Sequence, residues 1–315
     1  MLKENDGYLS GMEISRKLGV SRTAIWKNIN SLRSDGYQID SITNRGYQLI
    51  GSPDILNVTM IQDHLETELI GKEIEILKTI DSTNEEAKRR ANLGAESGLM
   101  IAAEEQTAGK GRFGRTWNSQ NNEAIYFTVL IRPELSPSDI ASITLAAGYA
   151  VCLAVREYTQ LDAKIKWPND IIIGHKKLCG ILTEMAAQSD KIDYIVIGIG
   201  ININQRSFPE EIKTKATSLY LETGHKIDRN DFFRIVIQKL DIVLKSFCVS
   251  VSVKDIENFK RLCATIGRKV TVQRFDSILE GTAIDITPSG ELVIKANDGK
   301  KYDINSGEVT VQGIY

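Results

Sequence analysis

Three glycines and three cations lie within the twelve residues QTAGKGRFGRTW, at positions 106–117. Glycines at this density disfavour a helix or a central strand, because each costs backbone entropy and offers no side chain to pack. Backbone N–H groups beside Lys110, Arg112 and Arg115 favour an anionic ligand. The residue order does not match the GxxxxGK[ST] phosphate loop. From spacing alone, such a segment is more often a flexible surface loop or a nucleic-acid contact than an active site.

A second group of polar residues lies in KIKWPNDIIIGHKKLCGILTE, at 164–184. Pro168 excludes a helix, so Asn169 and Asp170 are expected to begin an apolar strand. Asp170 is suited to hold a divalent cation bound to phosphates, although a turn residue that bonds its own backbone explains it as well. Lys177 is predicted in a turn between two strands, within reach of a buried anion. Taken alone, a solvated hairpin lysine is the commoner explanation.

The third group is Ser82, Thr83 and Asn84, which we place at a strand-to-helix junction. One of them is expected to cap the helix. Three small hydrogen-bonding side chains in a row offer more donors and acceptors than capping needs. A neutral polar head group, such as a urea or an amide, would match them.

The first fifty residues predict two short helices joined by a tight turn. Ser10 and Glu13 form a capping box at the start of the first helix. Ile14 and Leu18 give that helix an apolar face, and Gly19 is suited to end it in the left-handed conformation.

A second helix is expected from the N-cap Ser21 to Gly36, with Ile25, Ile29 and Leu32 pointing inward. A strand hairpin follows, which together with the helices indicates a winged helix-turn-helix. The alternative is a small helical domain with a solvated face, because residues 1–50 carry only seven Lys and Arg against five Asp and Glu. The candidate DNA contacts are Arg22, Thr23, Trp26 and Lys27 on the second helix and Arg45 at the hairpin tip.

Changes of pattern along the chain predict three domains, at 1–55, 56–265 and 266–315. Gly, Ser and Pro after position 50 indicate a linker. The middle region mixes strand and helix patterns, which suggests an α+β sheet domain. After about residue 266, short alternating segments separated by turn signals favour a small β-barrel.

Composition limits the possible functions. The net charge of −2 gives no global basic field, so nucleic-acid binding would need a local patch. The four cysteines show no metal or disulfide spacing. The charged first residues contain no signal peptide, and no uninterrupted apolar run reaches membrane-spanning length. We therefore expect a cytoplasmic protein without a membrane partner.

Taken in order, DSTN, EEQTAGKGRFGRTW, KWPNDI, KKLCGILTE and GIGININ resemble the biotin protein ligase family. With the winged helix before them, they resemble its bifunctional form, which also represses transcription of biotin genes. The resemblance covers nearly the whole chain and implies a biotin/lipoate ligase-like central domain and an SH3-like C-terminal barrel. Lys110 departs from the family, which usually has Arg there; the charge is kept but the bidentate fork is lost.

The resemblance implies roles for individual residues. Catalysis would rest on Lys177 and Arg112. The biotin site would comprise Ser82, Thr83, Asn84, Gln106, Lys110, Gly111, Arg112 and Lys177, and the nucleotide site Arg112, Arg115, Trp117, Lys166, Asn169, Asp170 and Asn202, with Asp170 the candidate Mg²⁺ ligand. Biotin and Mg²⁺–ATP would be substrates, with no tightly bound prosthetic group.

The implied chemistry explains a loop that is both cationic and rich in glycine. The biotin carboxylate must attack the α-phosphorus of ATP, and cations placed where charge develops lower that barrier. The product, biotinoyl-5′-AMP, is destroyed by water, so a loop that orders over it protects it. The expected partners are a carrier protein with an acceptor lysine, operator DNA, and a second copy of the chain when the adenylate is bound.

The sequence leaves two alternative functions open. A biotin-sensing transcription factor without ligase turnover would not need to retain Lys177, Arg112 and the KWPND segment. A lipoate-type acyl ligase would need a slot for a dithiolane, whereas residues 82–84 match a urea.

Overall fold

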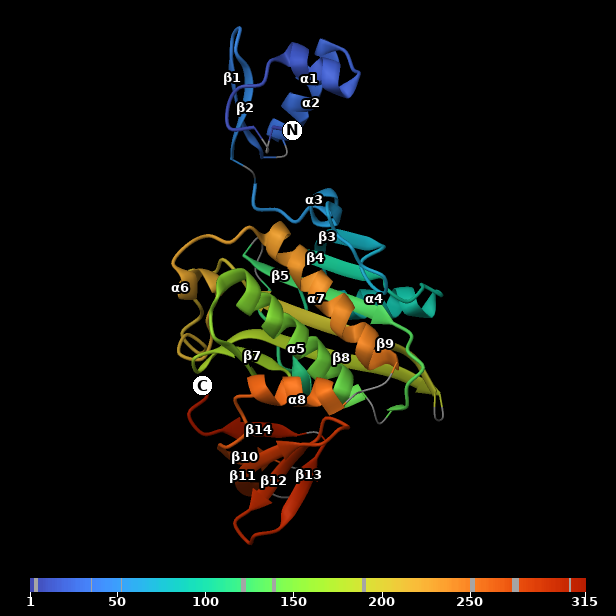
Figure 1. Ribbon diagram of the computed structural model, residues 1–315, viewed down its shortest axis with the longest axis vertical. Coiled ribbons are helices and arrows are strands. Elements are labelled where there is room, and N and C mark those ends of the chain that lie inside the picture. Colours follow the sequence, from blue (N-terminus) through green and yellow to red (C-terminus); the bar gives the residue numbers. More distant parts are fainter. Residues whose placement is uncertain are drawn as a thin grey trace. The chain divides into compact units, whose positions relative to one another are not determined.

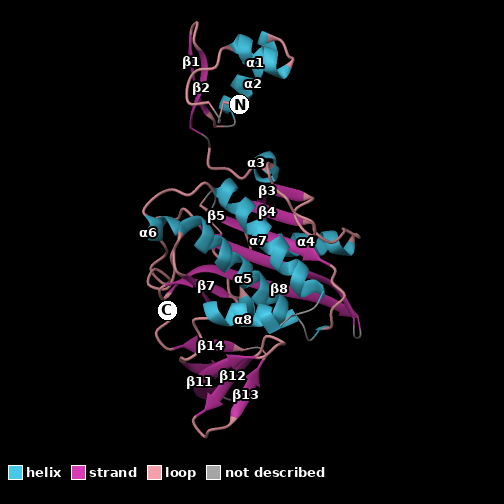
Figure 2. Ribbon diagram, viewed as in Figure 1, coloured by secondary structure: helices cyan, strands magenta, loops and turns pink. Residues whose placement is uncertain are grey.

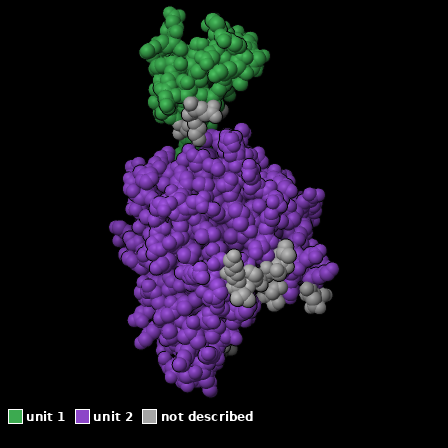
Figure 3. Space-filling view, viewed as in Figure 1, with its two compact units in different colours: residues 1–55 green, residues 56–315 purple. Residues whose placement is uncertain are grey.

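The computed structural model describes residues 1–2, 5–34, 36–51, 53–119, 123–137, 140–188, 191–249, 253–273, 278–305 and 307–315. The chain divides into two compact units, Met1–Ile55 and Leu56–Tyr315, which Figure 3 colours separately.

The first unit contains two helices and a two-stranded sheet, as the sequence predicts. Helix α1 spans Gly11–Leu18 and α2 spans Arg22–Ser34, and β1 (Gln38–Ile42) pairs antiparallel with β2 (Gly46–Gly51). The Ser10 hydroxyl accepts a hydrogen bond from the Glu13 N–H at 3.1 Å, and Gly19 ends α1 at φ 67°. The core of the unit consists of Leu9, Ile14, Ile25, Ile29 and Ile39.

Of the two residues predicted to form the apolar face of α1, Ile14 lies in this core and Leu18 does not. Its side chain is 55% exposed, whereas that of Ile14 is 5% exposed. Leu18 is the last residue of α1, beside the turn into α2.

The second unit is built on a seven-stranded mixed sheet with the order β3-β4-β5-β9-β8-β7-β6 (Figures 1 and 2). Only β3 and β4 are parallel; the other neighbours are antiparallel. The strands are β3 (Ile74–Ile80), β4 (Met100–Gln106), β5 (Ala124–Ile131), β6 (Ala163–Lys166), β7 (Asp170–Ile173), β8 (Lys176–Gln188) and β9 (Lys191–Asn202).

Helices cover both faces of this sheet. On one face α5 (Ile140–Thr159) and α7 (Arg229–Val249) bury the larger apolar cluster (Figure 1). On the other face α4 (Thr83–Asn92) packs through Ala87 and Ala91. Among the described residues, α5 is the one helix long and apolar enough to cross a membrane, but 61% of its most apolar window is buried, so it is a core helix. The remaining helices are α3 (Val58–Gln62), α6 (Leu219–Thr223) and α8 (Val253–Leu262).

The C-terminal part of this unit is a five-stranded antiparallel sheet, in the order β13-β12-β11-β10-β14. Its strands are β10 (Lys269–Gln273), β11 (Ile278–Ile286), β12 (Leu292–Ala296), β13 (Lys301–Ile304) and β14 (Glu308–Val311). Within the described part of the chain β13 and β14 are its two edges. The buried indole of Trp167 donates a hydrogen bond to the carbonyl of Gly290 at 3.0 Å, so the KWPND segment is anchored to this C-terminal sheet.

Candidate active site

Two cavities adjoin on the second unit, one of about 730 Å³ and one of about 60 Å³. Gly111, Arg112, Trp117, Asn169 and Lys177 line both, so these residues mark the junction between them. The structure brings together all the predicted ligand-site residues of this unit. The larger cavity is also lined by Arg115, Lys166, Asp170 and Asn202, and the smaller by Ser82, Thr83, Asn84, Gln106 and Lys110.

The glycine-rich segment folds back on itself after β4. The Trp117 N–H donates to the Gly109 carbonyl at 2.9 Å, and the Gly111 N–H donates to the Arg115 carbonyl at 2.7 Å. The tip is a short 3₁₀ turn, Arg112–Gly114, in which Gly114 has φ 72° and Phe113 has φ 57°. The three cations of the folded segment line the cavities.

Arg112 and Arg115 reach the C-terminal sheet. The Arg112 guanidinium donates to Asn169 Oδ1 at 3.1 Å and to the Gly307 carbonyl at 3.3 Å, while Arg115 forms an ion pair with Glu308. Burial lowers the pKa of Arg112 from its ordinary value, although a guanidinium remains charged at neutral pH. Two fixed cations therefore face the larger cavity.

Trp117 lies against the backbone of β8 and β9, where glycines leave room for it. A Cβ on Gly180 would come within 2.7 Å of the indole ring, and so would a Cβ on Gly200. The indole Nε1 is buried without a hydrogen-bond partner in the structure, and the Lys177 ammonium lies 5.1 Å from the ring centroid. Trp117 therefore forms part of the wall between the two cavities.

Lys177 lies inside β8, at its second residue, and not in the turn that the sequence predicted. The turn consists of Gly174 and His175, because the pairing between β7 and β8 continues as far as Ile173 and Lys176. The Lys177 N–H donates to the Lys215 carbonyl at 2.7 Å, and its carbonyl accepts from the Thr217 N–H at 2.9 Å. Its backbone is thus held on both sides.

The Lys177 ammonium lies 2.7 Å from Asp170 Oδ1. That oxygen is buried and makes no hydrogen bond of acceptable geometry, so the contact is an ion pair by distance only. The other oxygen, Oδ2, accepts from the Tyr315 hydroxyl. One oxygen of Asp170 is therefore held by Tyr315, and the other faces the Lys177 ammonium.

Lys166 is almost completely buried, with 7% exposure. Burial lowers the pKa of its ammonium to about 8, against the opposing attraction of Asp170. The ring of Tyr315 lies 3.7 Å from Lys166 Nζ. A bound anion would stabilise the charged form of an ammonium buried in this way.

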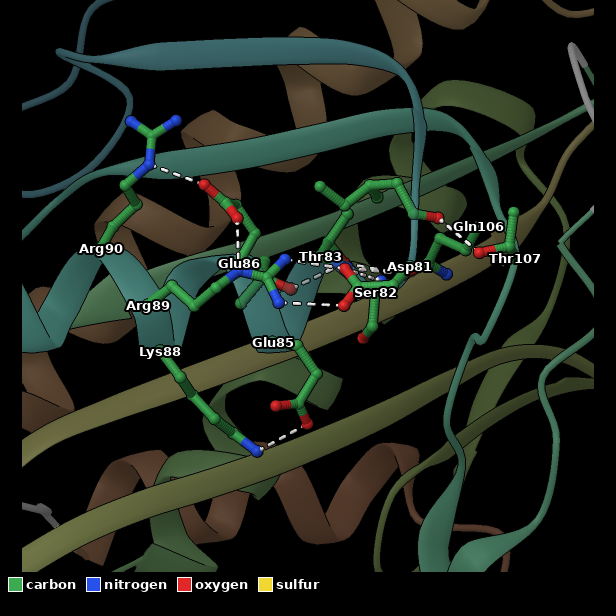
Figure 4. A network of polar contacts seen from close by, with 12 residues as sticks. Asp81, Ser82, Thr83, Glu85, Glu86, Lys88, Arg89, Arg90, Gln106 and Thr107 are labelled. Carbon is green, nitrogen blue, oxygen red and sulfur yellow. Dashed lines mark hydrogen bonds and ion pairs between the residues drawn. The ribbon is translucent and has the colours of Figure 1, made fainter.

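Ser82, Thr83 and Asn84 are buried where β3 leads into α4. Ser82 occupies the N-cap position, but its hydroxyl makes no capping bond, so the expected side-chain cap is not formed. The Asp81 carboxylate instead accepts from the Ser82 N–H at 2.7 Å and pairs with Arg89 (Figure 4). The hydroxyl of Ser82 therefore remains available at the small cavity.

Thr83 and Asn84 are held by neighbouring groups. The side-chain carbonyl of Gln106 accepts from the Thr83 N–H at 2.8 Å (Figure 4). The Asn84 amide donates to Glu184 at 2.8 Å, and its oxygen accepts from Thr128 at 2.6 Å. These bonds fix the side chains at the wall of the smaller cavity, which we call the slot.

Lys110 points to α4. Its ammonium lies 2.7 Å from Glu85, which also pairs with Lys88, and Lys88 lies 2.7 Å from Glu184. The chain of ion pairs joins the glycine-rich segment to the carboxylate that holds Asn84. Asn202, at the end of β9, is also engaged, since its amide donates to the Thr217 carbonyl at 3.0 Å.

The predicted DNA contacts all lie on the surface of the first unit. One exposed face of α2 carries Trp26, which is 57% exposed. Arg45 lies in the turn between β1 and β2, 5.5 Å from the Tyr8 ring. The other exposed residues of that helix face are Arg22, Thr23 and Lys27.

Several residues of the site were not predicted. Gly307, Glu308 and Tyr315 contact Arg112, Arg115 and Asp170 from the far end of the chain, and no local pattern identifies them. The glycines of the GIGININ segment could have indicated from the sequence that side chains pack closely against this strand. A Cβ on Gly198 would lie 2.1 Å from Asn84 Oδ1, so a glycine is needed there to admit the amide.

Three family models match the chain in order. An HTH domain model matches residues 1–48, the biotin/lipoate A/B protein ligase family matches 76–202, and a biotin protein ligase C-terminal domain matches 265–311.

Similar proteins match over almost the full chain. The bifunctional ligase/repressor BirA of Bacillus subtilis is 35% identical over 93% of this chain and 91% of its own length. The Escherichia coli protein of the same name is 30% identical over 99% of this chain and 95% of its own. The biotin protein ligase of Aquifex aeolicus, solved in complex with biotin and ATP, superimposes with a TM-score of 0.66 at 32% identity, covering 76% of this chain and 99% of that one.

Proposed function

Because this chain belongs to the family of bifunctional biotin protein ligases and repressors, we propose how its two units divide that function. The unit Leu56–Tyr315 makes biotinoyl-5′-AMP and transfers biotin to a carrier lysine, and the unit Met1–Ile55 binds operator DNA. The observation that carries the ligase proposal is the junction of the two cavities, where Arg112 and Lys177 line both. Two bound anions that meet there would react between these cations.

The first step joins biotin to AMP. A carboxylate oxygen of biotin attacks the α-phosphorus of ATP, the bond between the α-phosphorus and the bridging oxygen breaks, and pyrophosphate leaves. Arg112 and Lys177 neutralise the carboxylate and the α-phosphate as they approach. The 730 Å³ cavity suits the nucleotide, and the small slot suits the biotin head group once the Trp117 wall and the loop have moved.

The residues at each cavity support distinct roles. Ser82 offers a free hydroxyl to the biotin ureido group, while Thr83, Asn84 and Gln106 shape the slot. Lys110 and Gly111 cover the acyl phosphate. At the nucleotide we place Arg115, Trp117, Lys166, Asn169, Asp170 and Asn202.

Asp170 fits a role toward Mg²⁺, because it lines the larger cavity and its buried Oδ1 is engaged only by the ion pair with Lys177. The described residues contain no group of three or more His, Cys, Asp or Glu that would hold a metal ion alone. A single carboxylate together with substrate phosphates is the usual arrangement for this ion. When bound, the ion would neutralise phosphate charge.

The second step transfers biotin. The neutral amine of a carrier lysine attacks the acyl carbon, an amide forms, AMP leaves, and the amine loses a proton. The substrate and the catalytic competence can be tested together. Purified protein, MgATP and a biotin carboxyl carrier domain should give biotinylated carrier with biotin and none with lipoate. Binding of biotin without transfer would favour a sensor, and transfer of lipoate would favour the other acyl ligase.

For the repressor function we propose that Arg22, Thr23, Trp26, Lys27 and Arg45 contact operator DNA. A unit with so small a cationic excess should bind weakly alone. Two copies on a two-fold axis would bind two half-sites together and so more tightly. We propose that the adenylate favours this homodimer by ordering residues 106–117. Such a protein would act in the cytoplasm.

Sedimentation and operator binding, each with and without biotin and MgATP, test the regulatory proposal. Dimerisation and tight operator binding should both require the two ligands. Tight binding by an unliganded monomer would contradict this regulation, and the ligase proposal would be unaffected.

A further inference from the structure

Tyr315 contacts the nucleotide cavity from the segment after β14. Ile314 anchors this segment, since it is only 2% exposed and its N–H donates to the Val311 carbonyl at 3.1 Å. The Tyr315 N–H donates to the carbonyl of His175 at 2.9 Å, in the turn between β7 and β8. The side chain of Tyr315 is therefore held beside the start of β7 and lines the 730 Å³ cavity.

The hydroxyl of Tyr315 determines which oxygen of Asp170 faces the cavity. It donates to Oδ2, which leaves Oδ1 beside the Lys177 ammonium, 2.7 Å away. A carboxylate without this bond could rotate and exchange its two oxygens. The side chain of Asp170 is only 13% exposed, whereas Tyr315 is 36% exposed.

The ring of Tyr315 holds a second charged group. Lys166 Nζ lies 3.7 Å from the ring centroid. Within the described part of the chain the ammonium has no hydrogen bond or ion pair. A cation over an aromatic face is stabilised by the ring quadrupole, most strongly when water is excluded. One side chain thus positions both an anion and a cation of the proposed nucleotide site.

We infer that Tyr315 is a positioning residue for MgATP, acting through Asp170 and Lys166. The inference rests on the proposed function of the large cavity. Tyr315 should influence nucleotide affinity and leave biotin affinity unchanged, because it does not line the small slot.

Calorimetry with the full chain can separate these effects. The probes are biotin and the Mg²⁺ complex of α,β-methylene-ATP, which cannot be cleaved at the reacting bond. Tyr315→Phe removes the hydroxyl and keeps the ring. It should raise the Kd of the nucleotide about tenfold or more, as expected for loss of a hydrogen bond to a charged group, with the Kd of biotin unchanged.

Three further variants complete the design. Tyr315→Leu, which also removes the ring, should raise the nucleotide Kd beyond the Phe value. Tyr302→Phe makes the same chemical change on β13 of the same sheet and should bind both ligands normally. In an Asp170→Asn background, Tyr315→Phe should add no more than a twofold effect.

A wild-type nucleotide Kd in Tyr315→Phe would overturn the inference. So would an equal rise in both dissociation constants, or additive effects with Asp170→Asn. If Tyr315→Leu does not fold, the Phe variant still decides. A wild-type protein that binds biotin but not the nucleotide would instead contradict the proposed function.

Discussion

The ammonium of Lys177 lies 2.7 Å from the carboxylate of Asp170, and each of these side chains comes from a strand of the same hairpin. If the ammonium stabilises charge in adenylation, Lys177→Ala should reduce biotin-dependent exchange of pyrophosphate into ATP by at least about a hundredfold. The neighbouring variant Lys176→Ala, whose side chain does not line either cavity, should exchange normally. Equal activity of the two variants would exclude this role.

Arg112 is expected to retain the reactive adenylate. Arg112→Gly removes the bonds to Asn169 and Gly307 that hold the loop against the cavity. We expect biotin labelling of bystander proteins to rise roughly tenfold relative to carrier labelling, the factor for losing about 1.4 kcal/mol of interaction. Lys300→Gly, which removes a cation from an exposed turn, serves as the control. An unchanged ratio of bystander to carrier labelling in Arg112→Gly would show that the loop does not act as a lid.

The affinity for ATP should depend on pH through Lys166. Burial lowers the pKa of this ammonium to about 8, in the presence of Asp170, Lys177, Glu308 and Arg115. Below that pH the group is charged and attracts phosphate; as pH rises through about 8 it becomes neutral and the attraction is lost. The KM for ATP should therefore be flat below pH 8 and rise above it.

Lys166→Arg tests the assignment of this pH dependence, because a guanidinium stays charged throughout the range. The variant should show a flat KM for ATP where the wild type shows a rise. If both proteins show the same rise, another group is responsible.

The sequence predicted those parts of the site that are contiguous in the chain. Pro168 and the apolar residues after it predict the strand that presents Asp170, and the predicted strand-to-helix junction at Ser82 lies between β3 and α4. The location of Lys177 was predicted less well. Alternation of apolar residues indicates a strand but not where the preceding turn ends, and pairing with β7 places Lys177 within β8.

Contacts between distant segments could not be predicted. Glu308 and Arg115 are separated by 193 positions, and Tyr315 and Asp170 by 145. Contacts between the C-terminal part of the chain and the β6–β7 region, such as those of Trp167 with Gly290 and of Tyr315 with His175, bring them together. The exposure of Leu18 could not be predicted for a similar reason. Helical periodicity identifies the apolar face of a helix, but it does not show how far the neighbouring element covers that face.

We expect that a glycine at position 200 is required for the observed position of the Trp117 indole. A Cβ at this position would lie 2.7 Å from the indole, so Gly200→Ala must displace it. Overpacking of about 1–3 kcal/mol predicts a roughly five- to 150-fold rise in the Kd of the nucleotide, next to which we place the indole. Gly148→Ala in α5 is the matched control, because its new Cβ would have ordinary contacts of 3.7 to 3.8 Å. Nucleotide binding of equal strength by the two variants would contradict the proposed role of Trp117.

The most direct test of the central claim is to follow the α-phosphate of ATP. Protein mixed with biotin and α-labelled MgATP should retain one label as biotinoyl-5′-AMP. Addition of a carrier domain should release that label as AMP while biotin appears on a carrier lysine. A protein that retains no label with biotin present, or that retains it but never modifies the carrier, would contradict the account.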